Sequence, residues 1–123
     1  MAFLTDEALD QGLDYLDTNG TRLDICSTEP NTYLQATSTL SLGNDTVNVT
    51  ASTAGDTSGR KVTIPAITSG SVTGTGTAGF WALTNGSDTL LATNSLAASQ
   101  AVTSGNTFSL TAIDIEFAAA VSE

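Results

Sequence analysis

Histidine is absent from this 123-residue chain, and cysteine occurs once, as Cys26. Nucleophilic triads of the Ser-His type and zinc sites therefore lack the base or the ligands that they need. A disulfide within the chain is excluded as well, so we expect Cys26 to be a buried, unreactive thiol. Carboxylates are the acid-base groups that remain. The sequence predicts a protein that is not an enzyme and that binds no cofactor.

Basic residues and long apolar runs are also scarce. Three Lys and Arg stand against thirteen Asp and Glu, which gives a formal net charge of −10. Phosphate backbones and anionic lipid surfaces repel such a chain, so we expect no nucleic-acid partner and no membrane partner. The apolar runs fall far short of the roughly 20 residues that span a bilayer, and the N-terminus lacks the basic and apolar regions of a signal peptide. We expect a protein that is made and kept in a cytoplasm, or released by lysis.

One pair of carboxylates shares a direction. Asp114 and Glu116 alternate with apolar residues in a predicted strand and so project from the same face. A glycosidase needs two carboxyl groups that flank a cleft, which this spacing does not supply. The chain also lacks the spacing of a calcium-binding loop. We interpret the pair as solvated surface residues.

Threonine, serine and glycine dominate what is present. The chain has 22 Thr, 13 Ser and 11 Gly, and 40% of its residues are hydrophobic. β-Branched Thr favours pleated strands, and from Arg60 onward turn signals recur roughly every 8 to 12 residues. The composition predicts a mainly β protein. We expect an antiparallel β-sandwich or flattened barrel of roughly seven to nine strands, with one N-terminal amphipathic α-helix against one side.

The stretch 61–83 is the predicted centre of this fold. Residues 61–66 alternate between apolar and polar, which is typical of a half-buried strand. In residues 72–83, Thr alternates with Val and Gly before the apolar end, which indicates a second strand with one nearly bare face. We predict that the two strands form a hairpin with its turn at residues 68–71, and that another group lies close against the glycines. The fold prediction depends on this hairpin.

A helix is predicted at residues 5–18. Thr5 is a suitable N-cap, and acidic residues follow it in the first turn, where the helix dipole favours them. Apolar residues then recur on one face, and Asn19-Gly20 predicts a left-handed stop. We expect this helix to lie across a sheet. An arm docked on a partner is the alternative.

Shorter patterns complete the prediction. The first half of the chain gives a strand at 22–27, a turn at 29–31, a helical turn or an unassigned segment and then a strand within 32–42, a strand at 46–50 and a flexible loop at 51–59. In the second half, Asn85-Gly86 predicts a type I′ turn. Further turns at 94–95 and 104–106 enclose a strand at 98–103, and the last strand, 107–117, is expected to bend near Ala112, where its pattern changes phase.

We predict a single β-rich domain, 1–123, with an N-terminal arm and helix at 1–20 and a β-sandwich at 21–123. Phe80 and Trp81 are consecutive in a strand and so point to opposite faces. One of them belongs in the core, and the other needs cover from the helix or from a neighbouring subunit. The predicted core contains Leu13, Leu16, Leu23, Ile25, Val47, Val49, Val62, Ile64, Phe80, Leu91, Phe108, Leu110, Ile113 and Ile115.

Several motifs together resemble a family of small proteins encoded by tailed bacteriophages and prophages. They are ICSTEPNTY at 25–33, SLGN at 41–44, DTSGRKVT at 56–63, WAL at 81–83 and SQAVTSGNTF at 99–108. The likeness runs over nearly the whole chain. These motifs carry no chemistry, and the family offers no catalytic or ligand residues to transfer.

The resemblance implies a virion structural protein, and we expect capsid decoration, or cement, as its role. A tail or fibre component and a carbohydrate-binding β-module are the alternatives. As a decoration protein it would be made in the bacterial host cytoplasm, lie on the outer surface of the head, and bind the major capsid protein and itself, as a homo-oligomer and by preference a trimer. The candidate interface residues are Met1, Ala2, Phe3, Leu4, Arg60, Lys61 and Trp81.

Overall fold

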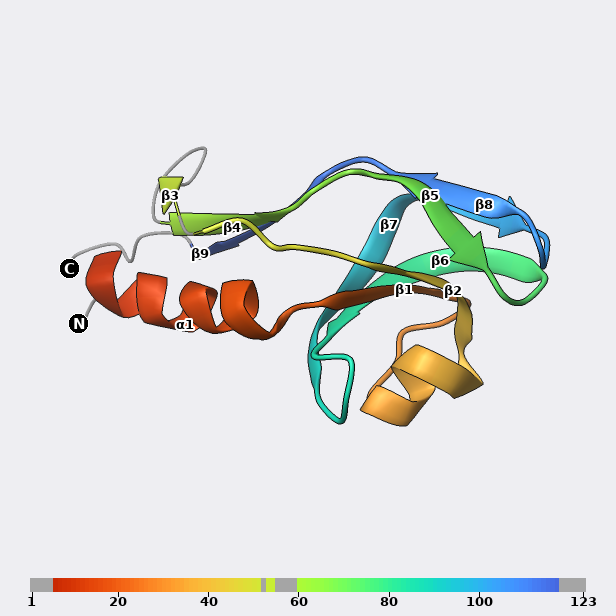
Figure 1. Cartoon of the computed structure of the whole chain (residues 1–123), viewed down its shortest axis with the longest axis horizontal. Helices are drawn as coiled ribbons and strands as arrows, with labels where there is room; N and C mark the ends of the chain where they lie inside the picture. Colours follow the sequence, from red (N-terminus) through yellow and green to blue (C-terminus); the bar gives the residue numbers. More distant parts are fainter. Residues whose placement is uncertain (1–5, 52, 55–59, 118–123) are drawn as a thin grey trace.

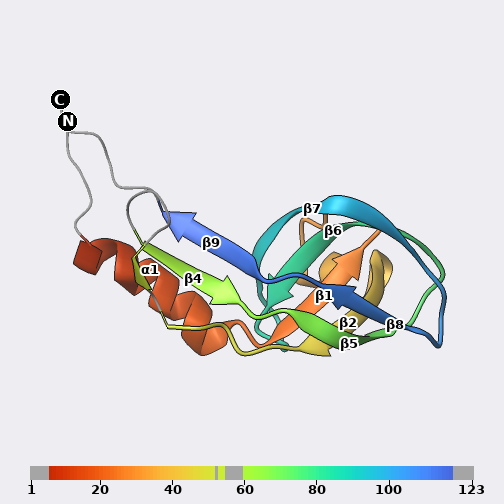
Figure 2. The ribbon, with the colours of Figure 1, turned by 90° about the horizontal axis from the view of Figure 1, so that it is seen from above.

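The computed structural model describes residues 6–51, 53–54 and 60–117. Six strands form one curled antiparallel sheet, a half-barrel, and three strands form a small second sheet. The curled sheet lies at one end of the molecule, while α1 and the small sheet lie side by side at the other end (Figures 1 and 2). This arrangement confirms the predicted class, which was a mainly β antiparallel protein with an N-terminal helix.

In chain order the elements are α1 (Asp6–Asn19), β1 (Arg22–Cys26), the π-helical turn η1 (Gln35–Thr39), β2 (Ser41–Thr46), β3 (Thr53–Ala54), β4 (Arg60–Ile64), β5 (Ile67–Val72), β6 (Gly76–Thr84), β7 (Leu90–Val102), β8 (Thr107–Leu110) and β9 (Ile113–Phe117). The strand order is β7-β6-β1-β2-β5-β8 in the curled sheet and β3-β4-β9 in the small one.

The predicted hairpin over 61–83 is wrong. That stretch forms β4, β5 and β6, and no two of these pair in the described part of the chain. β4 belongs to the small sheet, while β1 and β2 lie between β5 and β6 in the curled sheet. The fold class survives because each segment is still a strand. The partners are β3 and β9 for β4, β2 and β8 for β5, and β1 and β7 for β6.

The predicted turn at 68–71 lies inside β5 instead. Gly70 has no positive φ, so it does not serve as a turn residue. Its role is steric: a Cβ at Gly70 would lie 2.3 Å from two ring carbons of Phe108, the residue opposite it on β8. Glycine here allows the aromatic ring to lie against the backbone, as glycine in a strand often does.

The glycines of the second predicted strand do have a close neighbour, which is the side chain of Leu42. A Cβ at Gly74 or Gly76 would lie 3.4 Å from a methyl carbon of Leu42, which is ordinary van der Waals contact. Gly74 itself lies before β6 begins, and both Thr73 and Gly74 donate their N–H groups to the Leu42 carbonyl. The Leu42 side chain, which belongs to the same chain, therefore covers Gly74 and Gly76.

β4 and β5 continue one another and face β9 and β8 along a bent ribbon. Ile64 pairs with Ile113 in the small sheet, and Ile67 pairs with Leu110 in the curled sheet. Between these pairs lies Pro65, which has no N–H group to donate to a ladder. On the other side of the ribbon, residues 111–112 separate β8 from β9. The predicted bend near Ala112 is therefore confirmed, but the predicted last strand 107–117 is divided into two strands that belong to different sheets.

The curled sheet has a different cluster on each face. Leu23 pairs with Leu83 and Ile25 with Trp81, which puts these side chains on the inner face in the main core. On the outer face, Cys26 pairs with Phe80 in a second cluster. This cluster also contains Ala36 and Ala82, and Ala36 comes from η1.

Most of the predicted core is confirmed. The predicted core residues that are buried are Leu13, Leu23, Ile25, Val47, Val49, Val62, Ile64 and Phe108. Those that are partly buried and pack against the core are Leu16, Leu91, Leu110, Ile113 and Ile115. Phe80 is also partly buried, but it belongs to the outer cluster. Cys26 is buried as expected, and the predicted core omitted Ala36, Ile67, Val72, Ala78, Trp81, Ala82, Leu83 and Val102.

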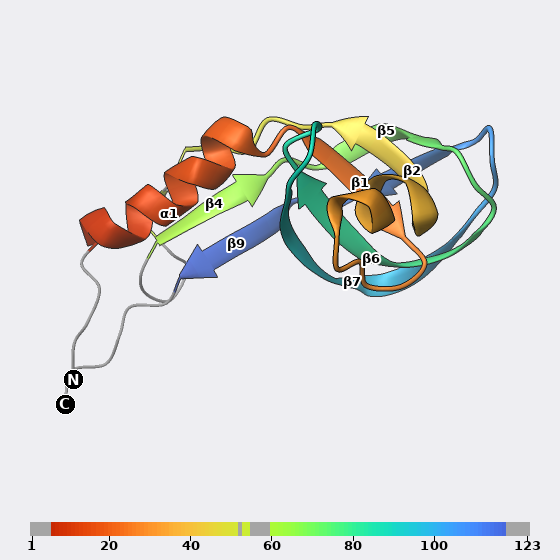
Figure 3. The same ribbon diagram turned by 90° about the horizontal axis from the view of Figure 1, so that it is seen from below.

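The helix is confirmed with a different ending. It lies along β4 (Figure 3), and its own residue Leu13 is fully buried. Gly20 follows the helix without a positive φ, so the predicted left-handed stop is wrong. A Cβ at Gly20 would lie 2.6 Å from the Leu16 carbonyl oxygen and 2.8 Å from the Leu83 side chain. The glycine therefore permits close approach of the helix end to β6.

Two other turns differ from the prediction. Gly86 has φ +75° but Asn85 does not have a positive φ, so the connection is not a type I′ turn. Its residues 85–89 form a wider loop, in which the Asn85 side-chain oxygen accepts the N–H groups of residues 87, 88 and 89 at 2.9–3.0 Å. The predicted turn at 94–95 lies within β7, whereas the turn at 104–106 is confirmed, with Gly105 at φ +91°.

The early segments are partly as predicted. Residues 32–42 form a helical turn and then the start of β2, which is one of the two possibilities left open. The strand expected at 46–50 is wrong in position, because β2 ends at Thr46, yet Val47 and Val49 are buried as expected. In the expected loop 51–59, Thr53–Ala54 forms β3 and pairs with β4; residues 52 and 55–59 lie outside the described residues.

Candidate functional site

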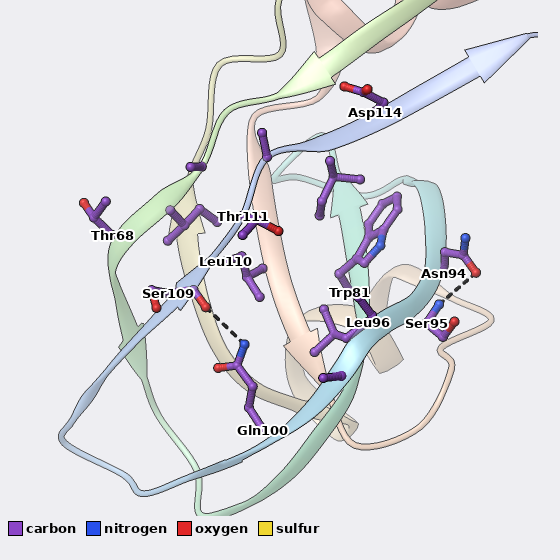
Figure 4. Close-up of a pocket in the computed structure, with 16 residues that line it drawn as sticks. Thr68, Trp81, Asn94, Ser95, Leu96, Gln100, Ser109, Leu110, Thr111 and Asp114 are labelled. Atoms are coloured by element: carbon purple, nitrogen blue, oxygen red, sulfur yellow. Dashed lines mark hydrogen bonds between the residues drawn. The ribbon is translucent and has the colours of Figure 1, made fainter. Parts of the chain in front are cut away.

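A cleft of about 740 Å³ lies where the curled sheet fails to close on itself. β7 and β8 are the edge strands of that sheet. One rim consists of residues 94–98 and 100 of β7, and the other of residues 109–114 at the β8-β9 junction. Residues 66–68 contribute from the start of β5. The side chains from both rims surround the opening in Figure 4.

Trp81 of β6 lies at the floor of the cleft (Figure 4). Its side chain is 6% exposed and belongs to the main core. Leu96 and Leu110 face it from the two rims. Trp81 also borders a second hollow of about 370 Å³, together with Asn94 and Asp114. The indole is thus the central apolar surface of this part of the molecule.

A bulge in β7 shapes the first rim. Phe80 pairs with Ser95 and Ala78 pairs with Gln100, so two steps along β6 face five steps along β7. Such extra residues bend a strand and redirect its side chains. The bulge displaces residues 96–99 from regular pairing and turns Leu96 toward the cleft. The Ser95 N–H group bonds to the Asn94 side-chain oxygen at 2.8 Å, which supports the bend.

The two rims meet at one end. The Gln100 side-chain amide donates to the Ser109 carbonyl at 3.1 Å, across the gap between β7 and β8 (Figure 4). Beyond it the chain turns through residues 103–106, whose Gly105 and Asn106 bond to Val72 at the end of β5. The cleft is therefore closed at the turn and wider toward Trp81.

Asp114 is the one acidic side chain among the lining residues, all of which lie in the described part of the chain. Its carboxylate accepts a hydrogen bond from the Thr63 hydroxyl at 2.8 Å and pairs with the Lys61 ammonium at 3.3 Å. The other polar lining side chains are hydroxyls and amides. The cleft therefore presents an apolar floor, uncharged polar rims and one compensated charge.

The predicted site residues fall in different places. Trp81 forms the cleft floor, and Lys61 reaches the rim through Asp114. Arg60 starts β4 and its backbone pairs with Phe117, away from the cleft lining. Met1, Ala2, Phe3 and Leu4 lie outside the described residues. The sequence reasoning missed the rim residues because it divided the segment 94–100 into a turn and a strand.

A buried charge was also missed. Asp24 is fully buried on the outer face of β1, where Arg22 donates two hydrogen bonds to it at 2.8 and 3.1 Å and the Ser41 hydroxyl a third at 2.7 Å. The hydrogen bond to Asp24 raises the pKa of Arg22. Nearby, burial raises the pKa of the Cys26 thiol to about 12, so the expectation of a buried thiol is confirmed.

No protein-family model, curated protein or solved structure matches this chain. The resemblance to the phage family therefore rests on the motifs quoted above. Within the described ranges, no group of three or more His, Cys, Asp or Glu side chains could hold a metal ion. None of the helices in those ranges has the length and apolarity needed to cross a membrane.

Proposed function

We propose that this chain is a non-enzymatic structural protein of a tailed-bacteriophage virion, namely a capsid decoration protein that binds the outer surface of the head and stabilises it. The motif resemblance supports the virion role. The placement of the charges supports the outer surface, and this is the observation that carries the proposal.

The two cationic side chains that the structure describes are both engaged by carboxylates of the same chain. Arg22 binds the buried Asp24, and Lys61 pairs with Asp114. With a net charge of −10, the protein has little positive charge to offer a polyanion. Packaged DNA carries one negative charge per roughly 1.7 Å of duplex, so a position inside the head would be strongly unfavourable. On the outside, the same charge favours solubility.

The role would be mechanical. A protein that binds the expanded shell, and not its dissociated subunits, stabilises the shell by mass action. Each copy would tie neighbouring capsomers together through the major capsid protein. A trimer stays a prediction that rests on the resemblance. Trp81 is 6% exposed and Leu42 lies against Gly74 and Gly76, so Trp81 and these glycines do not need cover from a neighbouring subunit.

The test is a binding experiment on particles of the parent phage from which the gene has been deleted. Purified protein is added to expanded shells and, as the matched control, to unexpanded shells. We expect binding to the expanded shells in many copies, visible as outer density in an image reconstruction, and a higher temperature of DNA release. Density inside the shell, or no binding to the head, would contradict the proposal. Few copies at one vertex would indicate a tail component instead.

A further inference from the structure

The sheet edges at the cleft are unpaired on both sides. β7 and β8 end the six-stranded order, so each has one edge without a neighbouring strand in the described part of the chain. The sheet curls until these two edges face each other across the cleft (Figure 4). A direct contact that crosses the gap is the side-chain bond from Gln100 to Ser109. The backbone groups at these two edges can therefore accept an added strand as a hydrogen-bond partner.

The lining selects for a particular chemistry. Trp81, Leu96 and Leu110 offer apolar contact, and the one carboxylate, Asp114, is already compensated by Lys61. A charged small molecule would lose its hydration here without gaining an opposite charge. An extended peptide gains two kinds of contact, because its backbone bonds to the sheet edges and its alternate side chains enter an apolar pocket.

We propose that the cleft binds an extended, apolar segment of a partner protein, which is added as a strand between β7 and β8. Its alternate side chains lie against Trp81, and the others face solvent. The net charge of −10 favours basic residues at the ends of that segment. The inference rests on the proposed function in naming the partner as the shell protein. The binding chemistry of the cleft does not depend on that identity.

The first test uses the acetylated and amidated peptide Lys-Val-Thr-Val-Thr-Val-Lys. Trp81 is the one Trp of the chain, so its fluorescence reports directly on the cleft floor. We expect saturable binding. Methylating the backbone nitrogens of all the valines, or of both threonines, removes the donors that face one sheet edge, and either change should weaken binding about tenfold. Equal binding of the methylated peptides would overturn strand addition, and so would no binding of the parent peptide.

Two alanine positions on β7 provide matched variants. Ala98 is exposed and lines the cleft, whereas Ala101 is exposed on the same strand outside the lining. Ala98→Phe should fill the cleft and weaken peptide binding by about tenfold or more, and Ala101→Phe should leave it within about twofold. Equal urea midpoints verify that both variants fold. Equal peptide affinities in the two variants would refute the site.

The same variants separate this inference from the proposed function. If wild type and Ala98→Phe bind expanded shells equally, the cleft is not the capsid contact, although the decoration role stands. If wild type binds the peptide but no shell, the decoration role fails and the cleft proposal holds. Sedimentation of the protein alone tests a second copy as occupant. Self-association that Ala98→Phe abolishes would assign the cleft to another copy of this chain and overturn the proposal.

Discussion

Replacing Gly70 with alanine tests the contact that the sequence pattern concealed. The added Cβ would lie 2.3 Å from two carbons of the Phe108 ring and 2.8 Å from a third. Phe108 is 3% exposed, so its ring cannot move outward without disturbing the core. The same ring lies near Gly43, where a Cβ would be 3.2 Å away. The ring must shift by most of an ångström to relieve the clash.

The expected cost follows from two opposing terms. Overpacking a closely packed core costs about 1–3 kcal/mol. Alanine also lowers the conformational entropy of the unfolded chain relative to glycine, which raises the free energy of unfolding by about 0.4–1 kcal/mol. We therefore expect Gly70→Ala to lower the free energy of unfolding by about 1–2 kcal/mol. The matched control is Gly76→Ala, whose Cβ would meet Leu42 at an ordinary 3.4 Å. That variant should be neutral or slightly more stable.

Urea unfolding followed by Trp81 fluorescence measures both variants. With a slope of about 2 kcal/mol per molar, which is typical of small proteins, the Gly70→Ala midpoint should fall by about 0.5–1 M. In a Phe108→Leu background the same substitution should cost at most about half as much, because residues in contact couple energetically. A Gly70→Ala protein as stable as Gly76→Ala would refute the steric explanation.

The remaining predictions concern Cys26 and Asn85. Burial raises the pKa of Cys26 from 9.0 to about 12, so a disulfide reagent should leave the native thiol unmodified at pH 8 and react with it in urea. The unfolded thiol loses its proton near pH 9 and the folded one near pH 12, so the free energy of unfolding should fall as pH rises over that interval. The free energy of unfolding of Cys26→Ala should depend less steeply on pH. Equal pH dependence in the two proteins would contradict this cause. Hydrogen bonds from Asn85 and Thr89 lower the pKa of Asp88, so Asn85→Ala should raise it in an NMR titration, and an unchanged value would contradict that cause. Asn85→Ala should also lower the free energy of unfolding by about 1–2 kcal/mol, because three backbone N–H groups lose their acceptor.

Local signals in the sequence determined the class of the protein. Period-two patterns gave strands, the N-terminal periodicity gave α1, and the phase change near Ala112 marked the passage between sheets. Burial of Val47 and Val49 was also predictable, because alternation selects a face even where no regular strand forms. These features depend on neighbours within a few residues, so the sequence alone is enough to identify them.

The pairing of the strands was decided by the tertiary structure. Every strand offers the same backbone donors and acceptors, so the pattern near 61–83 favoured pairing within that stretch. Packing of the whole chain instead selected β3 and β9 for β4, β2 and β8 for β5, and β1 and β7 for β6. Gly70 reads as a turn residue until the Phe108 ring opposite it is known. The cleft arises in the same way. Its two rims are joined by the turn at residues 103–106, but they belong to opposite edges of the six-stranded order and enclose a cleft because the sheet curls. The charges of Arg22 and Asp24 likewise gave no local sign of burial, since the covering segment is η1, which packs over β1 from elsewhere in the chain.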